Sequence, residues 1–506
     1  MGMKTIKFKW LALPLTLLMI ALAGCQAVAG FDINKALVQS IQPTSSESKQ
    51  TLSVELVPAT GTLSAEDKKT IDLINSFSLN VDSAKMQDAS NISIKGSVGY
   101  DGNKLPFHLS MDDKGMAIQV EGAKQPVYIS LDPADTGMPD MTEYQDQIQQ
   151  LTKKASEFVL KHLPNPSKVS VKQGSETVNG ESLNLTNLQV ELRGDELIGL
   201  IKPFLTSVAK DEQGVKDLIG TFYDVFYPLM SSGMGTDIID SYATDILPES
   251  KAVTVAAMAA ALQEELNNLL ADYDQQMADL MAETPELATI LGKDTVLKMN
   301  LYFDSKLNIR KEKVELNIAL PASEDLPIQA VKVHVDSEIW NVGGTVKTDE
   351  VNTAAGVIDA MDPYLTPGQI LRNFDTNSVI YKILKDEMQI SYKYILLDPY
   401  NDYYEVISKK NTSFVPLRYL SEQLDADVKW TPGSSQIVIT DDITGAKIAV
   451  TKGSNKATVN GQPVTLPQAV FVHEDGTMYV PLRFIAESLG ATVNVDEEGW
   501  ITVERP

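Results

Sequence analysis

The chain contains 1 cysteine in 506 residues, and its position is the first feature that could carry chemistry. Cys25 directly follows an apolar segment at residues 10–23, and Lys4, Lys7 and Lys9 precede that segment. A single thiol cannot form an internal disulfide, a cysteine-based zinc site or a redox pair. The chemistry that its position favours is covalent modification beside a secretion signal.

The residues around this cysteine read Leu22-Ala23-Gly24-Cys25, which resembles the bacterial lipobox, Leu-[Ala/Ser]-[Gly/Ala]-Cys. The apolar segment suits a signal peptide and is too short to span a bilayer comfortably. The resemblance implies a signal peptide over residues 1–24 and cleavage that makes Cys25 the mature N-terminus. It also implies a lipid such as palmitate on the Cys25 sulfur, and two acyl chains suffice for stable anchoring. The alternative is a plain secreted protein with an incidental cysteine.

Two 17-residue segments near the C-terminus repeat each other, "FVPLRYLSEQLDADVKW" at 414–430 and "YVPLRFIAESLGATVNV" at 479–495, with 8 identical positions. In each copy a strand is expected to end at the valine, and the proline opens a helix because its missing N–H costs nothing there. Two further short strands follow, so each copy is predicted to be a β-α-β-β unit. The shared motif residues are Val415, Pro416, Leu417 and Arg418, and Val480, Pro481, Leu482 and Arg483.

The two motif arginines could be read as a ligand site. Each has a glutamate four residues on, Glu422 after Arg418 and Glu487 after Arg483. Residues at this spacing lie on one helix face, so the favoured reading is a surface ion pair.

The VPLR motif, with "KATVNGQPVTL" before the second copy and "ATVNVD" within and after it, closely resembles the copper amine oxidase-like N-terminal domain. That domain, also called the stalk domain, is common in exported proteins of Gram-positive bacteria. The resemblance covers residues 385–506. The first copy has Asp425 where the pattern has Gly490, which predicts a different helix exit in the first copy.

The family name invites a copper site, but the resemblance is to the stalk and not to the catalytic domain. Copper and its quinone cofactor need three converging histidines and a tyrosine in an Asn-Tyr context. The sequence has no Asn-Tyr dipeptide, and its 4 histidines have no paired spacing: His108, His162, His334 and His473. We therefore predict no metal, no cofactor and no catalytic residue.

Other common catalytic motifs are missing from the sequence as well. No Gly-x-Ser-x-Gly, phosphate-binding glycine loop or His-Glu-x-x-His occurs. The acidic residues Asp132, Asp135, Asp140 and Glu143 miss the spacing of a calcium-binding EF-hand loop. A cell-wall-active enzyme of unknown class stays open as an alternative, because paired carboxylates cannot be chosen among 68 acidic residues without geometry.

The length and net charge of the chain limit the number of domains and the kinds of partner that can be expected. A chain of 506 residues is expected to form two or three domains. Its formal net charge of -25 repels phosphate backbones and anionic lipid head groups, so we predict no nucleic-acid partner.

The segment order predicts an α+β protein. Residues 25–60 are Ser-rich in part and are expected to form a tether. Residues 61–346 alternate strand and helix patterns, with a helix starting at Ser64 and a hairpin turn at Asn179-Gly180. A helical insertion occupies 195–291.

A linker with a short helix, broken at Pro363 and Pro367, is expected over residues 347–384. The stalk domain follows it.

The pattern over residues 60–345, less the insertion, resembles the LolA/LppX-type lipoprotein carriers. The likeness rests on an early helix, a meander starting near "ASNISIKGSVGY" and the hairpin "VKQGSETVNGESLNLTNLQVEL". It implies a half-barrel-like sheet that curls around helices and can hold acyl chains.

These observations predict a non-enzymatic, lipid-anchored protein on the extracellular face of the cell membrane. The stalk domain is expected to contact a cell-wall or envelope protein partner, or to act as a scaffold. The alternative is carriage of an apolar or lipid ligand by the N-terminal half-barrel.

Overall fold

The computed structural model describes residues 30–42, 44–132, 135, 145–231, 250–323, 326–398, 406–497 and 499–506. The chain is a mixed α+β protein with two compact units. The first unit comprises Met1–Met116 and Leu131–Glu350, and the second comprises Ala117–Ser130 and Val351–Pro506. The expected continuous domain over 61–346 is therefore interrupted, because residues 117–130 belong to the second unit.

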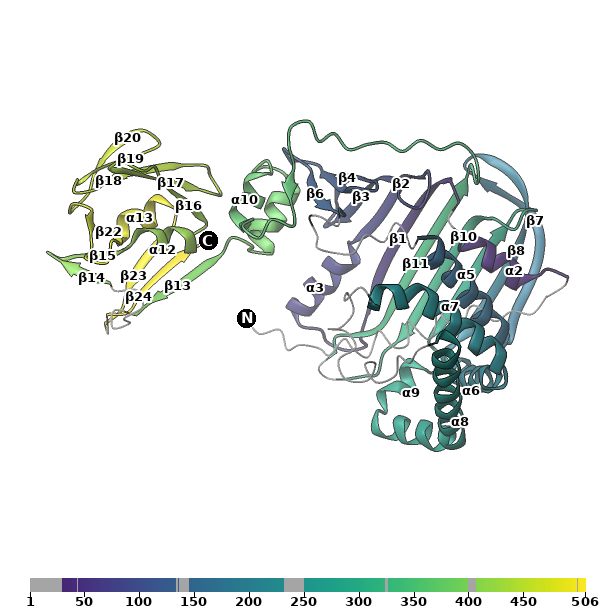
Figure 1. Cartoon of the computed structure of the whole chain (residues 1–506). Helices are drawn as coiled ribbons and strands as arrows, with labels where there is room; N and C mark the ends of the chain where they lie inside the picture. Colours follow the sequence, from purple (N-terminus) through teal and green to yellow (C-terminus); the bar gives the residue numbers. More distant parts are fainter. Residues whose placement is uncertain are drawn as a thin grey trace. The chain divides into compact units, whose positions relative to one another are not determined.

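The first unit is built on an antiparallel sheet that curls like half a barrel (Figure 1). Its strand order is β4-β3-β2-β1-β11-β10-β9-β8-β7, so the first and last strands of the unit are neighbours near the middle. The strands are β1 (Ser46–Pro58), β2 (Ser78–Met86), β3 (Ile92–Tyr100), β4 (Asn103–Met111), β7 (Lys168–Val178), β8 (Glu181–Arg193), β9 (Val296–Phe303), β10 (Ile309–Ala319) and β11 (Ile328–Trp340). Strand β5 (Gly115–Val120) crosses the boundary between the units.

The tether expected over residues 25–60 is wrong for most of its length. Residues Ile33–Ser40 form helix α2, and β1 hydrogen-bonds to β2 on one side and β11 on the other. The signal for β1 is the alternation of Leu52, Val54 and Leu56 with polar residues, which the serines before it obscured. Residues 1–29, including Cys25, lie outside the described part of the chain.

The helical insertion lies between β8 and β9, as predicted. Its helices, together with α5, lie on one side of the curled sheet (Figure 1). Ser64 caps α3 by accepting the Asp67 N–H, which confirms that predicted start. Besides α2, the helices of the first unit include α3 (Ala65–Asn75), α5 (Gln145–His162), α6 (Gly194–Lys210), α7 (Glu212–Ser231), α8 (Lys251–Glu283) and α9 (Glu286–Ile290). The last four of these form the insertion.

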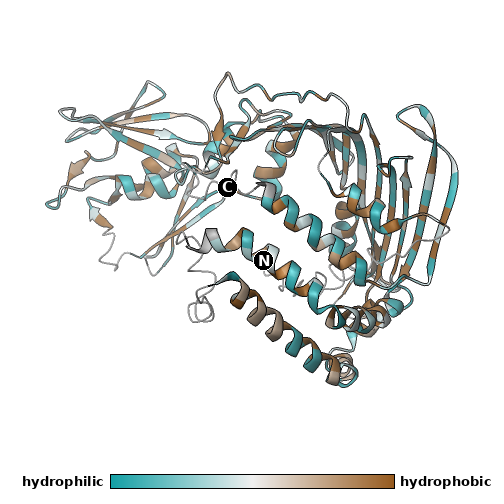
Figure 2. Cartoon of the chain, turned by 45° about the vertical axis from the view of Figure 1, so that its right-hand side comes forward, coloured by the Kyte–Doolittle hydropathy of each residue, from teal (hydrophilic) through white to brown (hydrophobic). Residues whose placement is uncertain are grey.

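Two hydrophobic cores join the helices of the first unit to its sheet and to one another. Ile33 of α2, Leu197 of α6 and Ile290 of α9 pack on buried residues of β8, β9 and β10, among them Leu192 and Phe303. A second core joins the helices themselves, through Val208, Val215, Ala259 and Leu266. Hydrophobic and hydrophilic residues alternate along these strands and helices (Figure 2), as one-sided burial requires. Among the described residues, no helix is both long and apolar enough to cross a membrane.

The turn predicted at Asn179-Gly180 is confirmed, and a second Asn-Gly turn joins β19 to β20. Asn179 and Gly180 join β7 to β8 with φ angles of 48° and 81°, and Asn460 and Gly461 have φ angles of 51° and 80°. Positive φ at both central positions is the requirement of a type I′ turn.

The second unit contains three small antiparallel sheets. Two of its short helices, α12 (Leu417–Gln423) and α13 (Leu482–Ser488), pack in the core that these sheets share. The sheet orders are β13-β24-β23, β14-β15-β22-β21 and β16-β17-β18-β19-β20, and β6 pairs with β12 in parallel. The elements are β6 (Val127–Ser130), β12 (Ile358–Asp359), α10 (Pro367–Arg372), α11 (Val379–Lys382), the π-helix Ile383–Glu387, β13 (Lys393–Leu397), β14 (Ile407–Lys409), β15 (Thr412–Pro416), α12 (Leu417–Gln423), β16 (Ala426–Trp430), β17 (Gln436–Asp441), β18 (Lys447–Thr451), β19 (Lys456–Val459), β20 (Gln462–Thr465), β21 (Phe471–Val472), β22 (Met478–Pro481), α13 (Leu482–Ser488), β23 (Thr492–Val495) and β24 (Ile501–Arg505).

Part of the expected linker over 347–384 is a packed part of this unit. Thr366 caps α10 in a reciprocal capping box, and its hydroxyl donates to Asp442 Oδ2 at 2.8 Å. Gly368 lies so close to Ile443 that a Cβ would sit 2.9 Å from the Ile443 side chain. Pro367, expected to break a helix, instead begins one, because the first helical turn needs no N–H there.

The predicted difference between the two helix exits is wrong. Asp425 follows α12 with a φ of 52°, and Gly490 follows α13 with a φ of 77°, so both helices end in the same left-handed conformation. Aspartate tolerates this conformation better than most residues. The Asp425 carboxylate also pairs with Lys393 Nζ at 2.9 Å, which holds the residue in place.

Candidate functional site

The histidines considered for copper do not converge. His108 lies against the Asp349 carbonyl oxygen at 3.1 Å, His162 lies among helices of the first unit, and His473 lies in the second unit. Within the described ranges no group of three or more His, Cys, Asp or Glu residues could hold a metal ion. Of the acidic cluster considered for calcium, Asp140 and Glu143 lie outside those ranges.

The structure brings together a serine, a histidine and an aspartate whose proximity was not predicted from the sequence. His162, at the end of α5, is buried; its Nδ1 lies 2.8 Å from Ser207 Oγ and its Nε2 lies 2.9 Å from Asp211 Oδ2. Ser207 and Asp211 are four residues apart and therefore share one face at the end of α6. That spacing was the available signal, but nothing in the sequence ties it to His162.

The surroundings of this Ser-His-Asp group favour a structural role over catalysis of acyl transfer. A catalytic serine needs free N–H donors beside it to stabilise an oxyanion. Ser207 lies inside α6, where backbone N–H groups are used in the helix. Asp211 also accepts from Lys161 Nζ at 2.6 Å and from the Gly214 N–H at 3.1 Å. The carboxylate therefore joins the end of α5 to the junction of α6 and α7.

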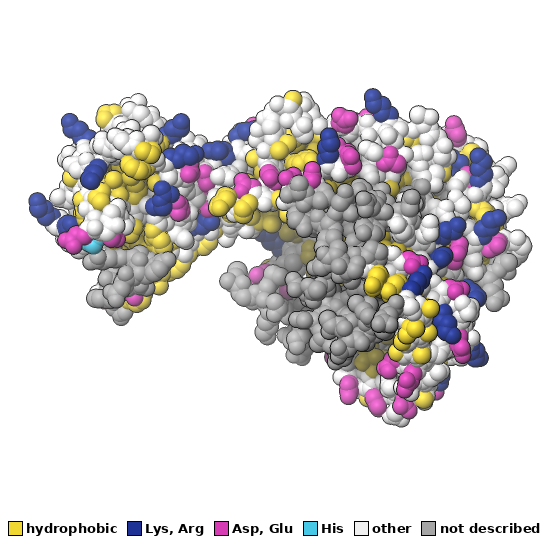
Figure 3. Space-filling view, in the orientation of Figure 1, with side chains coloured by type: hydrophobic (Ala, Val, Ile, Leu, Met, Phe, Trp, Pro, Cys, Tyr) yellow, Lys and Arg dark blue, Asp and Glu magenta, His cyan; other side chains and the backbone are white. Residues whose placement is uncertain are grey.

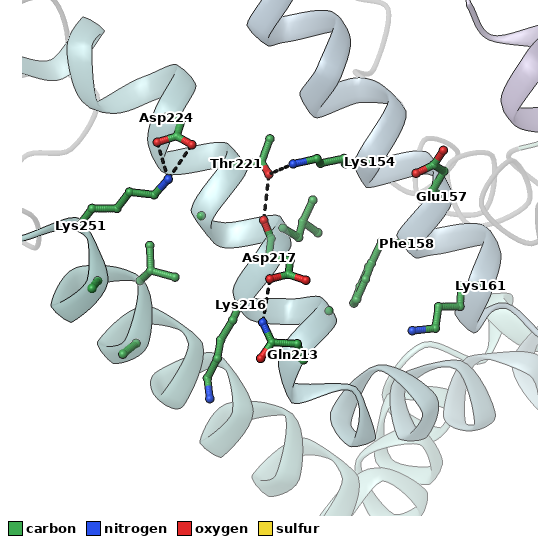
Figure 4. Close-up of a pocket in the computed structure, with 16 residues that line it drawn as sticks. Lys154, Glu157, Phe158, Lys161, Gln213, Lys216, Asp217, Thr221, Asp224 and Lys251 are labelled. Atoms are coloured by element: carbon green, nitrogen blue, oxygen red, sulfur yellow. Dashed lines mark hydrogen bonds and ion pairs between the residues drawn. The ribbon is translucent and has the colours of Figure 1, made fainter.

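Beside this link a groove of about 830 Å³ opens between α5, α7 and α8 (Figure 4). Lys251 pairs with the Asp224 carboxylate at 2.6 Å, and Lys154 donates to the Thr221 hydroxyl at 3.1 Å. The charges that line the groove nearly balance, with four cations and three anions: Lys154, Lys161, Lys216, Lys251, Glu157, Asp217 and Asp224.

The lining of the groove also contains apolar and small residues. Phe158, Leu218 and Val255 line it together with Gly214 and Gly220. A groove whose lining carries nearly equal numbers of cations and anions has no single-sign field to hold a strongly charged ligand. Its mixture of charged and apolar side chains suits contact with an amphipathic surface.

The two motif arginines lie where the spacing predicted. Arg418 Nη1 lies 2.7 Å from Glu422 Oε1, and Arg483 Nη1 lies 3.5 Å from Glu487 Oε1. Both ion pairs are more than half exposed, so each contributes little to stability.

The comparison with protein families bears on the second unit. Residues 402–503 match the family model described as the copper amine oxidase N-terminal domain. The match supports a domain of this family in that part of the chain. This domain is a non-catalytic, stalk-like domain, and the match contains both VPLR segments. No curated protein matches the chain.

Two glycines in the helical groove provide a matched pair of variants. In Gly214→Ala the new Cβ would lie 2.7 Å from Asp211 Cγ and 2.9 Å from Phe158 Cε2, which displaces the carboxylate. We expect a loss of about 1–3 kcal/mol in unfolding free energy. In Gly220→Ala the nearest side-chain atoms are 3.9 and 4.0 Å away, so higher helix propensity should add about 0.5–1 kcal/mol. Urea unfolding followed by circular dichroism at 222 nm measures both; equal effects would contradict the packing described.

Acid should weaken the Asp211 link. The hydrogen bond from Lys161, then that from the Gly214 N–H, lowers the pKa of Asp211 to about 2, against an opposing effect of burial. A carboxyl whose folded pKa is depressed stabilises the protein above its unfolded pKa and loses that contribution as pH falls toward 2.

We therefore expect Asp211→Asn to cost about 1–2 kcal/mol at pH 7, with solvent screening the exposed Lys161. The difference from wild type should shrink between about pH 4 and about pH 2, because the carboxyl becomes protonated over that range. Urea unfolding at each pH measures it. Asp224→Asn is the control, since its pair with Lys251 is half exposed and should matter little. A pH-independent difference for Asp211→Asn would overturn this account.

Proposed function

We propose that this protein is a lipid-anchored, non-enzymatic protein of the extracellular face of the cell membrane. In this proposal the stalk domain contacts other components of the cell envelope or acts as a scaffold. The observation that carries it is the match of residues 402–503 to a non-catalytic stalk-like domain. The lipobox-like sequence at Cys25 supports the anchor.

We further infer that the stalk domain is a duplication. The element order β15-α12-β16-β17 is repeated as β22-α13-β23-β24, and β15 pairs with β22. Leu420 and Leu424 of the first copy are buried in the same core as Ile485 and Leu489 of the second. Two copies that share one core form a stiff module, which suits a protein that works by contact.

The anchor can be tested by metabolic labelling with an alkyne analogue of palmitate. We expect wild-type protein to be labelled and retained in membranes, because the Cys25 thiol is the only one in the chain. Cys25→Ala should abolish labelling and release the protein from membranes. Ala27→Ser is the control, since it changes the same region without removing the thiol. Labelling that persists in Cys25→Ala, or that is absent from wild type, would overturn the anchor.

A second candidate function is carriage of an apolar ligand by the first unit. The curled sheet with helices on one side supports it (Figure 1), as do Met258 and Leu262, which lie four residues apart on one face of α8 and are more than a third exposed. The sheet face over β8, β9 and β10 is already filled by packed side chains, so a ligand would lie against the helices instead.

Lipid extraction tests this second function apart from the anchor. Organic solvent releases non-covalently bound lipid, whereas an acyl group on Cys25 stays attached. If the exposed face of α8 holds a ligand, wild type should yield a stoichiometric lipid by mass spectrometry and Leu262→Glu should lose it. Glu264→Gln, also exposed on α8, is the control. Protein that yields no lipid would refute carriage and leave the anchor untouched.

A further inference from the structure

The second unit contains a pocket that the proposed function does not yet use. It encloses about 540 Å³ and lies between the start of α12, the β16–β17 turn and the β21–β22 hairpin. Figure 3 shows hydrophobic side chains gathered on this unit with Lys and Arg side chains around them. The residues that give the pocket its chemistry are Arg418, Trp430, Ser434, Ser435, Lys452 and Thr477.

Trp430 is the largest apolar side chain in the pocket lining. The residue is 54% exposed although tryptophan is normally buried. The indole N–H donates to the Ser434 carbonyl oxygen at 2.8 Å, so the turn holds the ring in place. A ring fixed in this way offers its flat face, with little conformational entropy to lose on binding. Flat exposed indoles stack on ligands that present C–H or π surfaces.

The pocket lining is positively charged, whereas the chain as a whole is negatively charged. The chain has 68 acidic and 43 basic residues, yet the described residues that line this pocket include Arg418 and Lys452 and no acidic side chain. The nearby carboxylates Glu422 and Asp475 are occupied by Arg418 and by Thr477. The guanidinium of Arg418 has five N–H donors and Glu422 takes one, so others can reach a ligand.

We propose that this pocket binds an acidic glycan, a sugar polymer that carries carboxylate or phosphate groups. A sugar ring stacks on Trp430, its acidic group pairs with Arg418 and Lys452, and its hydroxyls meet the Ser435 hydroxyl. A nucleic acid would need many cationic contacts to overcome the net charge of -25. The proposal rests on the stalk domain being the contact module and names the class of its ligand.

The repeat supplies a comparison within the same unit. Aligned on the VPLR motif, Val495 stands where Trp430 stands and Arg483 where Arg418 stands. Val495 is 56% exposed, so the backbone presents this position equally in both copies. Arg483 donates to the Val493 carbonyl oxygen at 3.2 Å. Because the second copy lacks the aromatic ring, one site per chain is expected.

Isothermal titration of the full chain in mild detergent tests the proposal. The probes are an oligogalacturonate, a phosphorylated mannan fragment, neutral maltohexaose, polyglutamate and a proline-rich peptide. We expect one of the two acidic glycans to bind at one site per chain, and the other three probes to bind at least tenfold more weakly. The acidic probe that binds identifies carboxylate or phosphate as the recognised group.

Variants separate the site from general charge. Trp430→Ala should weaken binding at least tenfold, while Val495→Ala should leave it unchanged. Lys452→Ala should weaken binding several-fold and reduce its dependence on salt. The proposal is overturned if neither acidic glycan binds, if polyglutamate or the peptide binds as tightly, or if Trp430→Ala equals Val495→Ala. Intact lipid labelling at Cys25 in that case would leave the anchor standing.

Discussion

The pairing of β1 with β11 is the constraint on which the first unit depends. Residues from Glu47 to Pro58 run antiparallel to residues from Trp340 back to Ile328, so strands almost three hundred residues apart in sequence become neighbours. β1 also pairs with β2, and β11 with β10, so the two halves of the sheet meet only across this pair. Without it, each half would present an unpaired edge. The helical insertion can be long because β8 and β9, which flank it, are themselves paired.

Buried charges have a comparable role in the second unit. Arg505, near the end of the chain, lies 2.7 Å from Asp441 Oδ1, and both side chains are at least 95% buried. Arg505 also donates to the Leu424 carbonyl oxygen at the end of α12. Removing one partner of such a pair leaves an uncompensated buried charge, which costs about 3–5 kcal/mol. The pair therefore fixes the last strand, β24, to β17 and to the exit of α12.

Local signals allowed much of this fold to be predicted, and long-range ones did not. Ser64 and Asn179-Gly180 were found because a helix cap and a type I′ turn depend on neighbouring residues. β1 was taken for a tether, because its partners lie far along the chain and its first residues are polar. The link of His162 to Ser207 and Asp211 was missed for a related reason: only packing of α5 on α6 brings them together. Asp425 was misread because an aspartate can take a glycine's conformation when Lys393 pairs with it.

A strongly acidic chain can still present a site for acidic ligands, because charge acts locally. At physiological ionic strength the Debye length is about 8 Å, so exposed carboxylates farther away contribute little to the field at a pocket. The electrostatic potential beside Trp430 is then set by Arg418 and Lys452. The net charge of -25 acts instead on approach, since it repels a long polyanion and slows its association. An acidic polymer should therefore be held by a few stacked and paired units, with the aromatic ring contributing as much as the cations.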